Sequence, residues 1–229
     1  MKPVLLIHGS CHGAWCWRNV LPILNKYGDA RAIDLPGAGS DKTPIPQITM
    51  DHYIEAILDA VTEPTLLVGH SMAGFPIAAA AERAPEKIAR LIFVCAYVPR
   101  SGLSMIDMRR AAPEQPLREA IETAADRQSY QFRPDMVEAK FYHDCPPGTL
   151  GYARPLLTAQ AILPQATPIT LSDTYARIEK RYIRCTQDQA IPPAYQTVMS
   201  QGLVDTVDLH CGHSPFFAQP DALAKHIMR

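Results

Sequence analysis

The sequence has no excess of charge of either sign and no long hydrophobic run. Its 22 lysines and arginines balance 23 aspartates and glutamates, which gives a net charge of -1 and a pI near 6.7. Nucleic acids and anionic membranes select basic surfaces, so we expect neither as a partner. Apolar runs such as LIFVCAYV at 91–98 are too short to cross a bilayer. The N-terminal MKPVLLIHGS lacks a cleavable-signal pattern, which indicates a cytoplasmic protein.

The sequence also lacks paired cysteines. The chain has six cysteines, and none has the C-x2-C spacing of a zinc site. The pair Cys11-His12 and the stretch His210-Cys211-Gly212-His213 could hold a metal, but no second pair of ligands supports either one. In a cytoplasmic chain the cysteines are best interpreted as reduced, buried apolar residues. We therefore predict no metal and no other cofactor.

Apolar residues make up 47% of the 229 residues, enough for one domain with a large buried core. Short apolar runs alternate with helical patterns, which is typical of an α/β fold. The expected strands cover residues 3–9, 30–35, 65–70, 89–98, 180–186 and 206–210. They are apolar throughout, as in a mostly parallel sheet covered by helices on both faces. Helices are expected over 14–27, 49–61, after Ser71, from about Pro192 and over 220–228.

The alternation breaks between residues 99 and 168. Prolines are dense there and the hydrophobic pattern is helical and irregular, as in SMIDMRRAAPEQPLREAIETAADRQ. A flexible linker would not carry large apolar residues such as Phe141, Tyr142 and Leu156. We therefore predict a core of residues 1–98 and 169–229, and a mainly helical cap over 99–168.

The stretch LLVGHSMAGFPIAAAAERAP at 66–85 places a serine between an apolar strand and an alanine-rich helix. Small residues surround Ser71: Gly69 and Ala73 flank it at two-residue spacing, and Gly74 follows. This pattern is that of the nucleophile elbow, G-x-S-x-G, with alanine in the last place. The alternative is an ordinary strand–helix turn with a capping serine. His70 adjoins the serine and is assigned a packing role.

A serine nucleophile needs a general base and an acid that orients it, and on this architecture they follow in the order Ser, acid, His. Asp188 lies just beyond the strand at 180–186, and His213 lies just beyond the strand at 206–210. Taken alone, Asp188 could be a surface turn residue and His213 could belong to a structural turn. Their joint position after successive strands favours a catalytic triad of Ser71, Asp188 and His213.

The tetrahedral intermediate of acyl transfer needs two hydrogen-bond donors for its oxyanion. The first expected strand ends in His8-Gly9, so the backbone N–H of Ser10 would face Ser71 across the edge of the sheet. The N–H of Met72 supplies the second donor. Together these elements predict an α/β-hydrolase active site.

The chain resembles the α/β-hydrolase superfamily, and within it the plant methylesterase and hydroxynitrile lyase family with its bacterial relatives. The matching motifs are HGSCHGAWCW, VGHSMAG, FVCAYVP, YIRCTQDQAIP and GHSPFFAQP. The resemblance implies esterase activity on small carboxylic esters. Lyase members carry a lysine after the catalytic histidine and a threonine in the HG motif, where this chain has Ser214 and Gly9. Dehalogenases and epoxide hydrolases of this fold use an aspartate nucleophile, unlike Ser71.

The predicted activity is therefore hydrolysis of small esters of methyl-ester type, with an aryl, alicyclic or short-chain acyl group, by Ser-His-Asp acyl transfer. Candidate pocket residues, for which an ordinary core position is the alternative, are Trp15, Phe75, Tyr97, Phe132 and Phe216. Several other functions stay open: a slow ligand-binding or signalling protein, cleavage of an amide, carbamate, thioester or C–C bond, lyase chemistry, and a perhydrolase. The sequence leaves a homodimer open.

Overall fold

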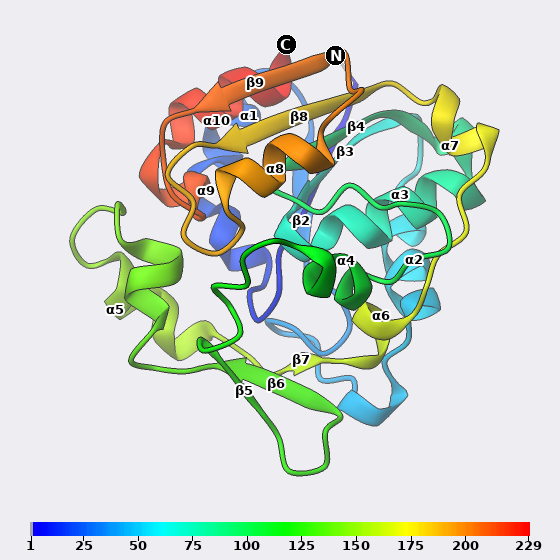
Figure 1. Cartoon of the computed structure of the whole chain (residues 1–229). Helices are drawn as coiled ribbons and strands as arrows, with labels where there is room; N and C mark the ends of the chain where they lie inside the picture. The colour runs from blue at the N-terminus through cyan, green and yellow to red at the C-terminus, as the bar shows by residue number, and fades with distance from the viewer. Residues whose placement is uncertain (1) are drawn as a thin grey trace.

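The computed structural model describes residues 2–229. Six strands form one sheet in the order β2-β1-β3-β4-β8-β9, and every neighbouring pair in it is parallel. Figure 1 shows this sheet with helices packed around it. The strands are β1 (Val4–Ile7), β2 (Ala30–Ile33), β3 (Thr65–His70), β4 (Ile88–Val94), β8 (Lys180–Cys185) and β9 (Asp205–Leu209). The predicted α/β-hydrolase architecture is confirmed.

The core helices follow the expected segments, with one correction near the N-terminus. They are α1 (Leu21–Leu24), α2 (Met50–Asp59), α3 (Gly74–Arg83), α7 (Asp173–Arg177), α8 (Pro193–Met199), α9 (Pro215–Ala218) and α10 (Pro220–Met228). The helix expected over 14–27 is instead a 3₁₀ segment, η1 (Ala14–Asn19), followed by the single turn α1. Pro22 lies in α1. Because proline has no N–H, it cannot continue a preceding α-helix.

Alternate residues along the strands build two hydrophobic cores. On β1, Leu5 and Ile7 face the core formed with α2, α3 and α8, while Val4 and Leu6 face the core formed with η1, α1, α9 and α10. Side chains of a strand point to opposite faces in turn, so a strand buried on both faces is apolar throughout. This is the physical basis of the continuous apolar runs in the sequence.

The segment between β4 and β8 contains both helices and a small sheet. Its elements are α4 (Met105–Ala111), β5 (Ile121–Thr123), β6 (Ser129–Phe132), a π-helical turn η5 (Glu138–Tyr142), α5 (Thr149–Ala153), η6 (Arg154–Leu156), β7 (Gln160–Ala161) and α6 (Leu163–Ala166). Strands β5, β6 and β7 form an antiparallel sheet in that order. The helical pattern assumed to run on to Gln128 is therefore wrong after α4. A turn at Asp126 and Arg127 (φ 58°) closes a hairpin there.

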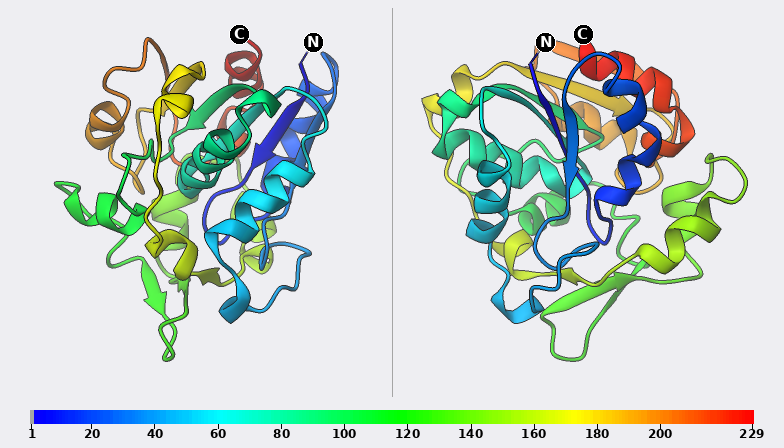
Figure 2. Two further views of the ribbon diagram at one scale, coloured as in Figure 1. Left: turned by 90° about the vertical axis from the view of Figure 1, so that its right-hand side faces the viewer. Right: turned by 180° about the vertical axis from the view of Figure 1, so that it is seen from behind.

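This segment lies on one side of the core, and the two chain termini lie close together on the opposite side (Figures 1 and 2). Its α4 helix begins at a capping box in which Ser104 and Asp107 satisfy each other's backbone N–H groups. No helix within residues 2–229 combines the length and the apolar character that crossing a membrane requires.

Candidate active site

Ser71 lies directly after β3, at the first residue of the short 3₁₀ turn η3 (Ser71–Ala73) that leads into α3. Its backbone has φ 55°, a left-handed conformation that is uncommon for serine and typical of strained functional turns. The turn is crowded: a Cβ on Gly69 would lie 2.9 Å from the carbonyl oxygen of Ala73, and one on Gly74 would overlap that of Tyr97. Only glycine fits at both positions, which explains the small residues around the serine.

The structure brings together the three side chains expected to form a triad. The Nε2 atom of His213 lies 3.1 Å from Ser71 Oγ, and its Nδ1 atom lies 2.7 Å from Asp188 Oδ2. All three residues are buried. Asp188 and His213 follow β8 and β9, as the sequence predicts. A carboxylate can only accept from Nδ1–H, and in the neutral ring this tautomer presents Nε2 to the serine hydroxyl as an acceptor.

Asp188 is held by three further hydrogen bonds. Its Oδ1 atom accepts from the N–H groups of Ala190 (2.7 Å) and Ile191 (2.9 Å), and Oδ2 accepts from Gln196 Nε2 (2.9 Å). Gln196, on α8, is fully buried, and its Oε1 atom also accepts from the N–H of Cys185 at the end of β8. Sequence analysis missed Gln196, because no motif marks a glutamine inside an ordinary helix.

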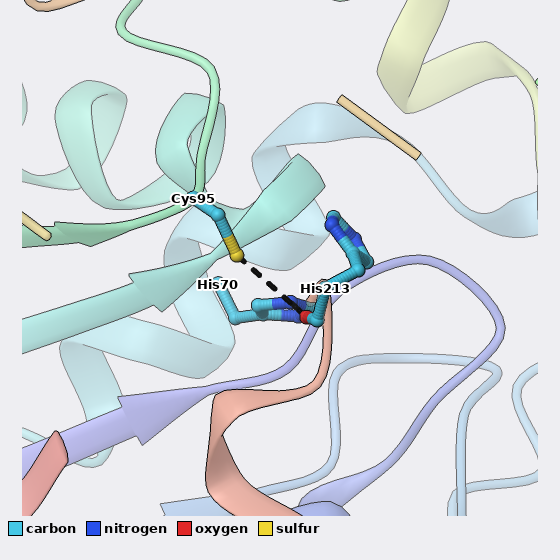
Figure 3. Close-up of side chains that lie close together, drawn as sticks. All are labelled: His70, Cys95 and His213. Atoms are coloured by element: carbon cyan, nitrogen blue, oxygen red, sulfur yellow. Dashed lines mark hydrogen bonds between the residues drawn. The ribbon is translucent and has the colours of Figure 1, made fainter. Parts of the chain in front are cut away.

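Two buried groups contact the backbone of His213. The Nε2–H of His70 donates to the His213 carbonyl oxygen (2.8 Å), and the thiol of Cys95 lies 3.6 Å from the same oxygen. Figure 3 shows the three residues arriving from different segments, with the thiol contact dashed. Burial lowers the pKa of His70 well below its usual value, so the ring is neutral. His70 thus has a positioning contact in addition to the expected packing role.

The side chains of His70, Cys95 and His213 also have the spacing of a metal site, with ligand atoms within 4.8 Å of one another. Both ring nitrogens of His213 already face Ser71 and Asp188. Burial raises the pKa of the Cys95 thiol to about 12, which keeps it protonated, whereas metals bind the thiolate. This donor set therefore fits the hydrogen-bonded arrangement better than a metal ion.

The loop that carries His213 is also held by residues 141–145, which have the sequence FYHDC. The Oδ2 atom of Asp144 accepts a hydrogen bond of 2.6 Å from the N–H of Gly212, the residue before His213. A Cβ on Gly212 would lie 2.5 Å from the His143 ring and 2.6 Å from Asp144 Oδ1. The close approach requires glycine at this position. The structure therefore connects residues 143 and 144 to the proposed base.

Ser10 and Met72 line the same pocket as Ser71 and His213. Within residues 2–229, the N–H of Ser10 has no hydrogen-bond acceptor, and the N–H of Met72 lies in the first turn of η3, where a helix leaves its N–H groups free. Both N–H groups are available to an oxyanion. His12 supports this loop: its Nδ1–H donates to the Ser10 carbonyl oxygen, and its Nε2 accepts from the Tyr142 hydroxyl (2.6 Å).

The catalytic pocket, as we call the cavity above Ser71, contains some of the predicted lining residues. Tyr97 and Phe132 line it. The expectation is wrong for Trp15, Phe75 and Phe216, which lie outside it: Phe75 and Phe216 are fully buried in the two cores, and Trp15 packs against Phe217. Residues that the prediction missed are His12, Met105, Arg109, Leu117, Ile121, Tyr130 and Phe141.

A serine on a strained turn after a buried parallel strand, with a histidine and a carboxylate after later strands, defines an α/β-hydrolase site. Residues 4–226 match the family model described as "Alpha/beta hydrolase family", and the chain belongs to this family. This result confirms the predicted superfamily.

The chain is similar in sequence to plant esterases. It is 28% identical to "Methyl jasmonate esterase 1" of Vitis vinifera, over 97% of this chain and 94% of that protein. It is 34% identical to "Esterase PIR7B" of Oryza sativa subsp. japonica, over 68% of this chain and 65% of that protein. Among solved structures, a pyrethroid hydrolase named PytH superposes with a TM-score of 0.89 at 26% identity, covering 99% of this chain and 96% of that one. The predicted resemblance to plant methylesterases and the assignment as a carboxylesterase-type hydrolase are confirmed.

Proposed function

We propose that this hydrolase cleaves small carboxylic esters of methyl-ester type through Ser71, His213 and Asp188. The observation that carries the proposal is the continuous hydrogen-bonded chain from Ser71 Oγ through His213 to Asp188, opening into a pocket that Ser10 and Met72 also line. The named esterase relatives support the ester bond as the target. Every group that this chemistry needs is supplied by the chain itself.

In the first step, Nε2 of His213 takes the proton of the Ser71 hydroxyl as Oγ attacks the ester carbonyl carbon. The carbonyl π electrons move to oxygen, and this oxyanion is bound by the N–H groups of Ser10 and Met72, each donor typically worth about 3 kcal/mol. Asp188 stabilises the imidazolium that forms. Collapse of the intermediate breaks the C–O bond to the alcohol, which leaves with the proton held by His213.

In the second step, water replaces the alcohol. His213 takes one water proton, the hydroxide oxygen attacks the acyl carbon, and the bond to Ser71 Oγ breaks as the serine regains the proton. The carboxylic acid is released and the chain returns to its starting state. The same two N–H groups serve both tetrahedral intermediates.

The walls of the catalytic pocket indicate the chemical character of the acyl group. Most of the lining side chains are apolar or aromatic, and they include Met105, Leu117, Phe132 and Phe141. Such walls favour an aryl, alicyclic or short-chain acyl group over a strongly polar one. Much of this wall comes from residues 99–168, which we propose to be a cap over the core.

Two positions favour hydrolysis over cyanohydrin cleavage. Ser214 follows His213 and is fully buried, with no hydrogen-bond partner for its hydroxyl within residues 2–229, so no ammonium group reaches the pocket from this position. At Gly9, a Cβ would lie 2.6 Å from Nδ1 of His70. A threonine there would require His70 to move.

The test is steady-state hydrolysis of a small panel by the wild-type chain and by Ser71→Ala. The panel holds aryl methyl esters, short p-nitrophenyl esters, a carbamate and an aromatic cyanohydrin. We expect ester turnover that Ser71→Ala abolishes while the circular dichroism spectrum is unchanged. Undiminished hydrolysis by Ser71→Ala would remove Ser71 as nucleophile.

A fluorophosphonate probe separates the remaining functions. Labelling of wild type at Ser71 without turnover of any panel member would favour a slow ligand-binding role or another scissile bond over ester hydrolysis. Peroxide-dependent oxidation in the presence of an organic acid would indicate a perhydrolase. Absence of both labelling and turnover would overturn the proposed function.

The proposed partner is a small-molecule ester, and no nucleic acid or membrane partner is proposed. All six cysteines are free in the structure, which is compatible with the proposed cytoplasmic location. Cell fractionation would test the location. A homodimer stays a prediction, which sedimentation of the purified chain would test.

A further inference from the structure

Arg109 has an unusual position for a charged residue. It lies in the last turn of α4 and lines the catalytic pocket together with Ser71 and His213. The other basic side chains of this pocket are histidines, and burial lowers the pKa values of His12 and His70, so both are neutral. Arg109 is therefore the only permanently charged side chain among the described residues that line the pocket.

Arg109 is partly buried, and its side chain makes no ion pair and no hydrogen bond within residues 2–229. By contrast, Arg90 and Arg181, whose side chains are 11% and 9% exposed, both pair with Asp205. A shielded charge without a counter-ion is unfavourable, because it loses hydration without gaining an attractive partner. The hydroxyl of Tyr97, which lines the same pocket, also makes no hydrogen bond in the described chain. Two polar groups are thus available to a ligand.

Two further cavities share walls with the catalytic pocket, and Arg109 lines both. The side cavity, of about 170 Å³, also contains Tyr97, Leu117, Glu114 and Arg118. The cap cavity contains Arg110 and Arg127. Four arginines and one glutamate therefore line the two outer cavities. The positive charge that lines these two cavities would attract an anion even though the whole chain has a net charge of -1.

We propose that Arg109 is a specificity-determining residue that selects esters carrying a carboxylate at the end remote from the scissile bond. The substrate class is the half-ester of an aliphatic dicarboxylic acid. Its methyl ester would lie at Ser71, its methylene chain against Leu117 and Ile121, and its carboxylate against Arg109 and Tyr97. This inference rests on the proposed ester hydrolysis and names its substrate class.

The chemistry of the guanidinium favours a carboxylate. Its planar pair of N–H donors matches the two oxygens of a carboxylate, and one positive charge neutralises one negative charge. A phosphate dianion would need a second shielded cation at the same wall. Arg110 and Arg118 are both exposed, and neither lines the catalytic pocket. The apolar side chains that line the catalytic pocket together with Ser71 and Arg109 suit a short methylene spacer.

A purely structural role for Arg109 makes a different prediction. An arginine in the last turn of a helix can stabilise the carbonyl end of the helix dipole. In that case, replacing Arg109 would lower the stability of α4 and affect charged and neutral esters equally. The ratio of kcat/KM for a half-ester to that for its neutral diester separates the two roles.

The experiment measures methanol release from monomethyl glutarate, adipate and suberate and from the matching dimethyl esters. We expect wild type to prefer the half-ester of one chain length. Arg109→Met should lower the ratio about ten- to a hundred-fold, the range for a hydrogen bond to a charged group, mainly through KM. Arg109→Lys should retain part of the preference. The matched control is Arg133→Met, which removes the same charge from an exposed pair with Asp135 outside these cavities.

An unchanged ratio in Arg109→Met, or wild-type preference for the dimethyl esters, would overturn the inference while leaving the proposed function intact. A second measurement does not require turnover: calorimetric titration of adipate into wild type and Arg109→Met. Binding that Arg109→Met loses and Arg133→Met keeps supports the carboxylate site. Equal binding by all three, or binding by none, counts against it. Loss of all ester turnover together with loss of Ser71 labelling would refute the proposed function separately.

Discussion

His70, the residue before the proposed nucleophile, donates a hydrogen bond of 2.8 Å to the backbone carbonyl oxygen of the proposed base, His213. The two residues are 143 positions apart in sequence and belong to the ends of different strands. The contact therefore ties the serine turn directly to the histidine loop. Within residues 2–229, the other ring nitrogen of His70, Nδ1, is buried beside Gly9 without a hydrogen-bond partner.

Replacing His70 should reduce turnover without removing any reacting group. We expect His70→Phe to lower kcat about five-fold, because losing one buried hydrogen bond costs about 1 kcal/mol and frees the His213 backbone. His70→Gln, which keeps a donor, should recover part of the rate. Steady-state kinetics on a p-nitrophenyl ester would measure both. Equal kcat values for His70→Phe and His70→Gln would show that only packing matters at this position.

Asp188→Asn should lower kcat by about 10⁴-fold if Asp188 fixes the tautomer of His213. The asparagine amide can donate to Nδ1, which would place the proton on Nε2 and block acceptance from Ser71. The control is Asp208→Asn, an exposed carboxylate paired with Arg184. A wild-type rate in Asp188→Asn would assign the acid to another residue.

Gln196→Met should destabilise the fold and slow the reaction together. The substitution removes the amide that donates to Asp188 and accepts from the N–H of Cys185, leaving buried groups unpaired. Such a loss costs about 1–3 kcal/mol. Urea unfolding would measure the stability, and kcat on the same preparation would report the orientation of Asp188. Stability and rate both at wild-type values would remove Gln196 from the site.

Asp144→Ala should loosen the loop that carries His213, because it removes the acceptor for the Gly212 N–H. We expect kcat to fall about ten-fold with little change in KM, since the lost bond is worth about 1–2 kcal/mol and the pocket walls remain. Asp135→Ala, on an exposed carboxylate of the same segment, is the matched control. A rise in KM with unchanged kcat would contradict a positioning role.

Stability should increase with pH between about 3 and 6.5. Burial lowers the pKa of His12 from 6.5 to about 3, and it also lowers the pKa values of His8 and His70. In this range the unfolded chain binds protons that the folded chain does not, so acid favours unfolding. Each histidine adds up to about 1.4 kcal/mol per pH unit. Urea midpoints at pH 5 and pH 7 would test this. A midpoint that is flat or higher at pH 5 would contradict it.

Local sequence patterns determined the main elements because burial on both faces of a strand requires a continuous apolar run. The strand predicted over 65–70 has the observed bounds of β3, and the final helix over 220–228 has those of α10. The prediction missed the hairpin of β5 and β6. Its strands form by pairing with each other, as Ile121 does with Phe132, whereas the local pattern of this segment is also compatible with a helix.

The sequence by itself determined the class of fold and the three residues of the candidate triad. Chain order and strand ends are properties of the sequence, and parallel strands bring their carboxyl ends to one edge of a sheet. Only the tertiary structure decided which side chains support the triad and line the pocket. Phe75 and Phe216 are buried in the cores while Arg109, Gln196 and Asp144 reach the site. These roles depend on contacts between residues far apart in the chain, which cannot be predicted from the local sequence.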